Sequence, residues 1–135
     1  SRVQLINNAV SNEIIHFKIN PYKNDTDDNR GKNITEVKDA SFPRSIVIND
    51  ILSDELNLNL YPLLIKIDIE GFEKNLFEKN VEWMDKFKIL IVELHDWMLP
   101  EKSISKNYLN AICRSMEKND RDILIKGENI ISIKV

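Results

Sequence analysis

The chain has 135 residues, of which 42% are hydrophobic and 30% charged, and its formal net charge at pH 7 is −3. This composition favours one globular domain, excludes a disordered chain, and offers no run of about 20 apolar residues that would span a membrane. Basic and acidic residues are mixed along the sequence without a basic stripe, so we expect no nucleic-acid partner. No signal peptide is visible and Cys113 is the only cysteine, so we expect a cytoplasmic protein without disulfides or a cysteine-based zinc site.

The first part of the chain combines short apolar segments with one long polar segment. The apolar run over residues 3–6 and the β-branched and aromatic run over residues 14–19 predict two strands. Residues 24–33 are rich in Asn and Asp and contain no large apolar side chain. They predict that residues 20–44 form a long polar loop or insertion within a single domain over residues 1–135.

A strand, a helix and another strand are expected after the polar segment. Residues 45–48 predict a short strand, and Asn49 or Asp50 is expected to cap a helix that ends near Leu56. Residues 63–69 are almost all Leu and Ile. Such a run predicts a strand with both faces buried, as in a parallel sheet.

The remainder of the chain alternates helices with strands and closes with a hairpin. Apolar spacing predicts a helix over residues 72–84, a fully buried strand over residues 88–94 and an amphipathic helix over residues 104–116. Alternating runs on either side of Gly127 and Glu128 predict a terminal hairpin. The buried face of the last helix is expected to consist of Tyr108, Leu109, Ile112 and Met116.

These elements together predict the fold class. Buried strands that alternate with helices indicate an α/β fold with a mostly parallel sheet, to which the hairpin adds antiparallel strands at one edge. We expect Trp83, Met84 and Phe87 to pack in its core, and Cys113 to be an inert packing residue on a helix.

Acidic residues and a histidine follow two of the predicted buried strands. Asp68 and Glu70 come where the first of these strands ends, and Glu93 and His95 come where the second ends. Alternation along a strand places Asp68 with Glu70, and Glu93 with His95, on the same side. If the strands are neighbours, all four converge on one rim, where α/β sheets bind ligands. Burying these carboxylates costs free energy unless cations, donors or protons compensate them, so a functional role is favoured.

Three further polar or aromatic residues near these strand ends have a structural interpretation. For Glu73 and Asp96 we favour capping of a following helix, or interaction with its dipole. Trp97 either lines the mouth of a pocket or covers the edge of the sheet. The acidic rim by itself fits metal-dependent hydrolases, transferases and general-base enzymes equally well.

The segment around these residues resembles a known signature. The sequence LLIKIDIEGFEKNLFEKN, followed by KILIVELHDW, is similar to the signature of FkbM-type S-adenosylmethionine-dependent methyltransferases. That family shows a hydrophobic strand ending in K-I-D-x-E-G-x-E, then a helix, then a strand ending in E-x-H. Upstream, Asn8-Ala9-Val10-Ser11 resembles the family's N-x-A-V-S step. The resemblance covers most of residues 4–97.

The resemblance implies a Rossmann-like class I methyltransferase fold and methyl transfer to a hydroxyl of a sugar, polyketide or similar small molecule. S-adenosyl-L-methionine would be the cosubstrate, with Ala9 and Val10 near its adenine. Asp68, His95 and Glu93 would be catalytic, with Asp68 or His95 as the base that removes the hydroxyl proton. Glu70 and Trp97 would bind the acceptor. No metal ion is implied.

The family's glycine-rich turn near the cosubstrate has no counterpart among Gly31, Gly71 and Gly127. The resemblance therefore implies that the chain corresponds to the C-terminal portion of such an enzyme and lacks its first strands. Two alternatives remain open from the sequence. One is a divalent-metal-dependent hydrolase that uses the acidic strand ends, and the other is a non-catalytic, partner-binding remnant.

Overall fold

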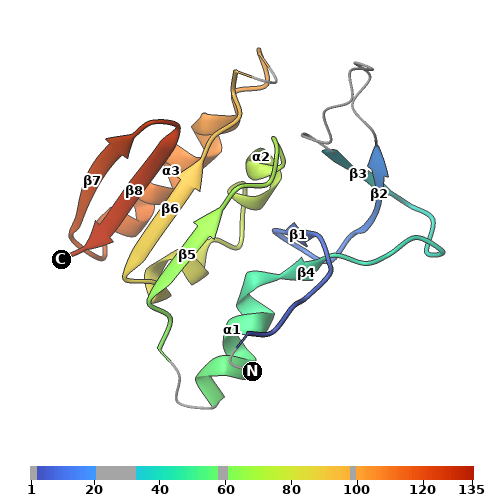
Figure 1. Cartoon of the computed structure of the whole chain (residues 1–135), viewed down its shortest axis with the longest axis horizontal. Coiled ribbons are helices and arrows are strands. Elements are labelled where there is room, and N and C mark those ends of the chain that lie inside the picture. The colour runs from blue at the N-terminus through green and yellow to red at the C-terminus, as the bar shows by residue number, and fades with distance from the viewer. Residues whose placement is uncertain (1–2, 21–32, 58–60, 98–99) are drawn as a thin grey trace.

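The computed structural model describes residues 3–20, 33–57, 61–97 and 100–135 and has an α/β architecture (Figure 1). Its main sheet has four strands in the order β5-β6-β8-β7. These strands are β5 (Leu64–Ile67), β6 (Ile89–Glu93), β7 (Arg121–Lys126) and β8 (Asn129–Lys134). The α/β class agrees with the sequence, and the terminal hairpin is confirmed.

The prediction of a mostly parallel sheet is wrong for this sheet. β5 and β6 are parallel, whereas β8 is antiparallel to both of its neighbours. The last strand of the hairpin pairs with β6, so the hairpin adds its antiparallel strands at one edge, as expected, and supplies half of the sheet. The hairpin turns through Gly127, whose φ of 60° is accessible to glycine at little steric cost.

The two apolar strands differ in burial. In β6, Leu90 and Val92 are buried and their neighbours are half-buried, so one face of this inner strand packs more tightly than the other. In β5, Leu64 is 48% exposed, and Leu63 just before the strand is 66% exposed. The expected burial of both faces is therefore wrong for β5, because the core covers the face with Ile65 and Ile67 while the face with Leu64 and Lys66 is exposed.

Helix α3 (Ile104–Met116) has the bounds that the sequence predicts, and it buries Tyr108 and Ile112 of the expected face but not the other two residues. Leu109 and Met116 are 51% and 40% exposed, and Cys113 is exposed rather than packed. A stripe that combines apolar with small or polar residues faces the protein instead, made of Ile104, Tyr108, Ala111, Ile112 and Ser115.

The expected helix over residues 72–84 is wrong in its extent. Only α2 (Glu73–Leu76) and the 3-10 helix η1 (Glu82–Lys86) form, with a turn between them. In that turn Asn80 has a φ of 55°, and its side-chain Nδ2 donates to the Asn12 carbonyl at 2.8 Å. The left-handed conformation interrupts a helix, and asparagine tolerates it better than most residues.

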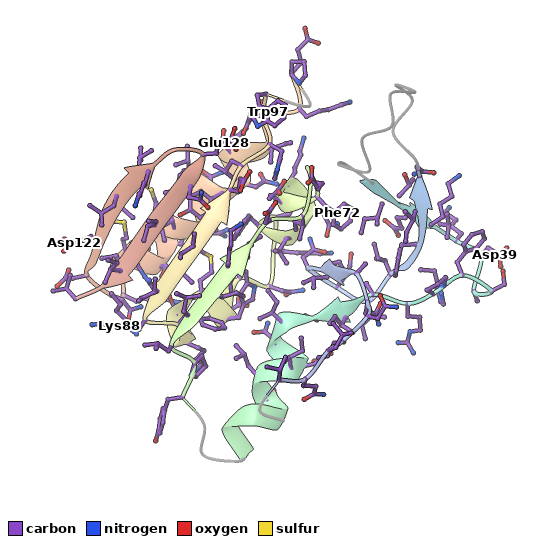
Figure 2. The ribbon with its side chains drawn as sticks, in the orientation of Figure 1. Asp39, Phe72, Lys88, Trp97, Asp122 and Glu128 are labelled. Atoms are coloured by element: carbon purple, nitrogen blue, oxygen red, sulfur yellow. The ribbon has the colours of Figure 1, made fainter. Side chains whose placement is uncertain are left out.

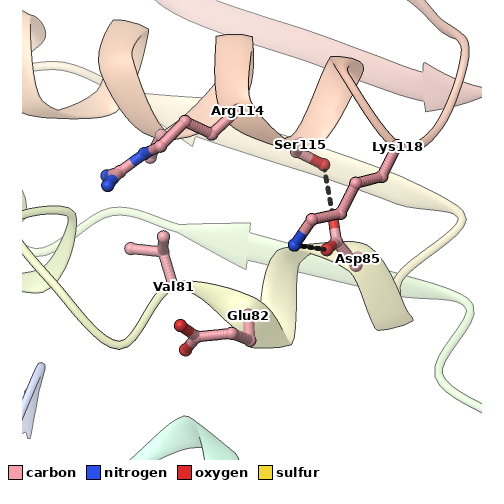
Figure 3. A pocket seen from close by; sticks show the side chains of 7 residues that line it. Val81, Glu82, Asp85, Arg114, Ser115 and Lys118 are labelled. Atoms are coloured by element: carbon pink, nitrogen blue, oxygen red, sulfur yellow. Dashed lines mark hydrogen bonds and ion pairs between the residues drawn. The ribbon is translucent and has the colours of Figure 1, made fainter.

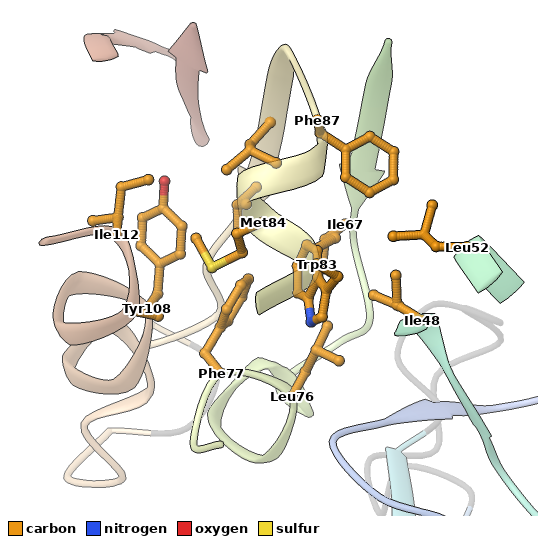
Figure 4. Packing of buried hydrophobic residues seen from close by; sticks show 13 residues of the cluster. Ile48, Leu52, Ile67, Leu76, Phe77, Trp83, Met84, Phe87, Tyr108 and Ile112 are labelled. Atoms are coloured by element: carbon orange, nitrogen blue, oxygen red, sulfur yellow. The ribbon is translucent and has the colours of Figure 1, made fainter. Parts of the chain in front are cut away.

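The hydrophobic core lies between the main sheet and helices α1 (Ile48–Asn57), α2, η1 and α3 (Figure 4). Aromatic rings form its centre, with Phe77 5.9 Å from Trp83 and 5.0 Å from Tyr108 between ring centroids. Met84 and Phe87 are 1% and 7% exposed, so core packing of this predicted group is confirmed. The core fixes α2 against the strand ends that carry the acidic residues.

The N-terminal part forms two small sheets beside the main one. β1 (Val10–Ser11) pairs in parallel with β4 (Ile46–Val47), and β2 (His16–Asn20) pairs antiparallel with β3 (Asn33–Val37). Residues 3–6 form no strand. The predicted loop contains β3, which pairs with β2, and residues 21–32 of that loop lie outside the described residues.

Helix α1 (Ile48–Asn57) follows β4 directly. It begins before the expected caps, so Asn49 and Asp50 lie in its first turn, where the Asp50 carboxylate favours the positive end of the helix dipole. None of the helices in the described segments is long and apolar enough to cross a membrane.

Candidate active site

The carboxyl ends of β5 and β6 bring four predicted residues together. The parallel register places Ile67 beside Val92, so the residues after these positions leave the sheet side by side. His95 Nε2 lies 3.7 Å from Asp68 Oδ1 and 3.8 Å from Glu93 Oε1. It also lies 3.9 Å from Glu70 Oε2. The structure therefore confirms that these four residues lie close together, as the sequence predicts.

A buried glutamate holds the histidine in place. Glu73 is fully buried and His95 is 2% exposed, and His95 Nδ1 lies 2.7 Å from Glu73 Oε1. The Ile69 backbone N–H donates to the same oxygen at 3.2 Å. With the carboxylate as acceptor, we assign the Nδ1 proton to this hydrogen bond, which leaves the Nε2 lone pair directed at the acidic residues.

Sequence reasoning missed this role of Glu73, which was expected to serve the helix dipole. Glu73 does lie in the first turn of α2, but its carboxylate reaches across to the next strand end. The pattern of a glutamate after Gly71 and a histidine after the following apolar strand was the signal that could have found it. For Asp96 the helix-related role is confirmed, since its Oδ2 accepts the Ser105 backbone N–H in the first turn of α3 at 2.9 Å.

Lys66 orients two of the carboxylates. Its Nζ lies 2.8 Å from Asp68 Oδ2 and 3.6 Å from Glu93 Oε2. Each carboxylate therefore turns one oxygen to Lys66 and the other to His95. The hydrogen bond to Asp68 raises the pKa of Lys66 above its ordinary value, so the lysine stays cationic. With Glu70 and Glu73 included, negative charge still exceeds positive charge at the rim.

The turn after β5 is tight and strained. Glu70 has a φ of 53° and Gly71 a φ of 95°. The left-handed region suits glycine and is costly for glutamate, by about 1–2 kcal/mol. This turn brings the Glu70 carboxylate to 3.9 Å from His95 Nε2, and it directs the chain into α2.

Trp97 follows the cluster as an exposed aromatic side chain. It is 67% exposed (Figure 2), and its ring centroid lies 6.3 Å from that of His95. The indole therefore lies beside the rim.

Ala9 and Val10 lie apart from the cluster, in and next to β1. The Ala9 carbonyl accepts the Ile46 backbone N–H at 2.8 Å, and Val10 lines an apolar pocket of about 210 Å³ between α1 and β5. Asn12, which follows β1, is linked to α2 because its backbone N–H donates to Asn75 Oδ1 at 3.3 Å. Within the described ranges, no hydrogen bond or ion pair joins Ala9 or Val10 to His95.

A second, polar pocket of about 90 Å³ lies between η1 and α3 (Figure 3). Its central carboxylate, Asp85, accepts from Ser115 Oγ at 2.6 Å and lies 3.6 Å from Lys118 Nζ. Nearby, the buried Arg121 donates to the Met84 and Phe87 carbonyls at 2.8 and 3.0 Å. These interactions join α3 and β7 to η1, so this pocket is structural.

The His95 cluster could also hold a metal ion. One ligand atom each from Asp68, Glu93 and His95 lie within 4.8 Å of one another. In a tetrahedral site with bonds of about 2.1 Å, ligand atoms lie about 3.4 Å apart, so a small contraction would bring the three to a common ion. Two carboxylates and an imidazole suit a first-row divalent ion.

Comparisons of the chain with protein-family models, with curated proteins and with solved structures find no match. The functional argument therefore depends on the residues and geometry of the cluster.

Proposed function

We propose that the chain is the catalytic part of an S-adenosylmethionine-dependent O-methyltransferase similar to the FkbM type, with a Rossmann-like class I fold. It would methylate a hydroxyl group of a sugar, polyketide or similar small molecule. The observation that carries the proposal is the buried Glu73–His95 pair, 2.7 Å apart, whose free ring nitrogen faces Asp68 and Glu93 at the ends of parallel strands.

The pair is suited to remove the proton of an acceptor hydroxyl. Nε2 of His95 carries the lone pair, and the fully buried Glu73 carboxylate stabilises the imidazolium that forms when the ring takes the proton. Of the two bases that the resemblance leaves open, the geometry favours His95, because Lys66 already neutralises Asp68.

The cosubstrate would supply an electrophilic methyl group on a positively charged sulfur. The excess of negative charge at the rim would attract this positively charged sulfur, so the rim suits the cosubstrate electrostatically. The exposed Trp97 and the half-buried Glu70 flank His95, so they are placed to contact the acceptor and align its hydroxyl with the base. Ala9 and Val10 are the proposed adenine contacts. They lie near α2, because Asn12, which follows them, is hydrogen-bonded to Asn75 on that helix.

Binding of the cosubstrate product tests the proposal first. We expect S-adenosylhomocysteine to bind the longest available gene product that contains this chain in isothermal titration calorimetry. A folded product that gives no heat of binding and no thermal shift with this compound would overturn the proposal.

Matched variants then test the role of the histidine. With labelled S-adenosylmethionine and a panel of hydroxylated acceptors, His95→Asn should lower turnover by about 10²–10⁴-fold while S-adenosylhomocysteine affinity changes little. Glu73→Gln should lower turnover by about 10–100-fold. His16→Asn is the control, because His16 is the other histidine and lies on β2. Equal activity of His95→Asn and His16→Asn would refute the assignment.

A second candidate is a divalent-metal-dependent hydrolase, favoured by the close approach of ligand atoms from Asp68, Glu93 and His95. A metal in this position would activate a water molecule. Mn²⁺ or Mg²⁺ should then raise the melting temperature, and Asp68→Asn should remove that shift. Absence of a shift with either ion eliminates this candidate and leaves methyl transfer untouched.

A further inference from the structure

The outer strand β7 presents an unusually apolar edge. It lies at one end of the strand order, and in the described sheet β8 is its single neighbour (Figure 1). Ile123, Leu124 and Ile125 are 43%, 53% and 76% exposed. Edge strands of soluble proteins are usually protected by proline, bulges or charges along the strand. β7 has continuous register and no proline, and within Asp122–Lys126 its charges lie only at the two ends.

The hydrogen-bonding groups that β7 leaves free can be derived from its pairing with β8. The Val135 backbone N–H donates to the Asp120 carbonyl at 2.9 Å, just beyond the paired residues. In an antiparallel ladder, residues that face the partner alternate with residues that face away. Asp122, Leu124 and Lys126 therefore bond toward β8. The N–H and C=O groups of Ile123 and Ile125 point outward.

We propose that β7 pairs antiparallel with β7 of a second copy of this chain, about a two-fold axis at Leu124. Outward-facing residues must lie opposite one another, and this register places Ile123 opposite Ile125 of the second copy. Leu124 then lies opposite Leu124 of the second copy. Asp122 lies opposite Lys126 of the second copy, which makes an ion pair on each side of the axis.

Charge complementarity selects this register over its neighbours. A two-fold axis at Ile125 would place Asp122 opposite Glu128 of the second copy, which is repulsive. An axis at Ile123 would place Lys126 opposite Asp120 of the second copy but Asp122 opposite Leu124, so only one of the two charged residues of the strand would meet an opposite charge. Within Asp122–Lys126, the axis at Leu124 alone pairs both charged ends while the apolar residues meet in the middle; Glu128 in the turn then lies opposite Asp120, which precedes the strand.

The pairing joins two four-stranded sheets into one continuous sheet. It covers the apolar edge and satisfies the free backbone groups of Ile123 and Ile125. β5 lies at the opposite end of the strand order, so the rim with Asp68 and His95 stays open in both copies. The inference is independent of the proposed methyl transfer.

Sedimentation velocity and light scattering of the full chain test the inference from micromolar to near-millimolar concentration. We expect a species of twice the 15.8 kDa chain mass. Lys126→Asp places two aspartates opposite each other and should give a monomer, and the double exchange Asp122→Lys with Lys126→Asp should restore the dimer. Lys106→Asp, the same charge change at an exposed position on α3, is the control and should leave the dimer intact.

A proline variant tests the backbone pairing separately. Ile125→Pro removes an outward N–H that β8 does not use, so it should abolish the dimer while circular dichroism stays unchanged. A wild-type chain that is monomeric at every concentration overturns the inference, and so does a dimer that persists in Lys126→Asp. A double-exchange variant that remains monomeric overturns the register at Leu124.

Discussion

The Tyr108 hydroxyl is a buried polar group that the core does not satisfy. Tyr108 is fully buried on α3, beside the Phe77 ring, and its hydroxyl has no hydrogen-bond partner among the residues that the structure describes. A buried hydroxyl without a partner costs about 1–3 kcal/mol of desolvation. Tyr108→Phe keeps the ring and removes that cost. We therefore expect it to raise the free energy of unfolding by about 1 kcal/mol at neutral pH.

The same residue makes stability fall at alkaline pH. Burial raises the pKa of Tyr108 from 10.0 to about 12, while the Arg121 charge opposes the shift. Because the folded-state pKa lies above the unfolded-state pKa, the contribution is fully present below pH 10 and is lost as the pH approaches 12. A shift of that size corresponds to about 2–3 kcal/mol.

Urea unfolding of the wild type and Tyr108→Phe measures both effects. At neutral pH the variant should be the more stable protein, and between pH 10 and 12 the difference should grow, because phenylalanine does not ionise. Comparing the two proteins cancels the titration of their lysines. A variant that is less stable at neutral pH, or one that loses stability with pH as steeply as the wild type, would refute the reasoning.

Further variants test the other structural arguments. Arg121→Met should lower the free energy of unfolding by about 3 kcal/mol in urea, because it leaves the Met84 and Phe87 carbonyls unsatisfied; a loss below about 1 kcal/mol would contradict this. Asp96→Ala should cost about 1 kcal/mol in the same assay, since the first turn of α3 loses an acceptor for Ser105, and no loss would show that this contact is unimportant. Glu70→Asn should raise the melting temperature, because asparagine better tolerates a φ of 53°; a decrease would mean that Glu70 contacts outweigh its backbone strain.

The sequence predicts the parts of the fold that depend on local pattern. The bounds of α3, the parallel pair β5 and β6, and the terminal hairpin follow from apolar spacing and from the glycine turn. The helix expected over residues 72–84 fails because its spacings of four and five also fit two short turns separated by a left-handed Asn80. The pattern of apolar side chains contains no information on such a change in backbone conformation.

The candidate site likewise combines features that the sequence predicts with features that it does not. Alternation and strand order are enough to predict that Asp68, Glu93 and His95 meet, because all three depend on two neighbouring strands. The role of Glu73 depends on how α2 turns back over those strands, and that is decided by the strained turn at Glu70 and by core packing. The burial of Ser115 on α3 could not be predicted either, because it depends on the contacts of Ser115 with Asp85 and Arg121.

The division of the chain into one large sheet and two small ones implies that its backbone does not open uniformly. The main sheet and its helices share one large core, whereas Ile15 and Phe17 on the N-terminal side are buried outside it. Amide hydrogens of β2 should therefore exchange with solvent through local opening, well before those of β6 and β8. His95 and its carboxylates belong to the slowly exchanging part and β2 belongs to the fast one, while Val10 on β1 packs against the large core. A ligand that touches both parts would lose binding free energy to the ordering of the fast part. Its binding would then slow amide exchange in a region remote from the histidine.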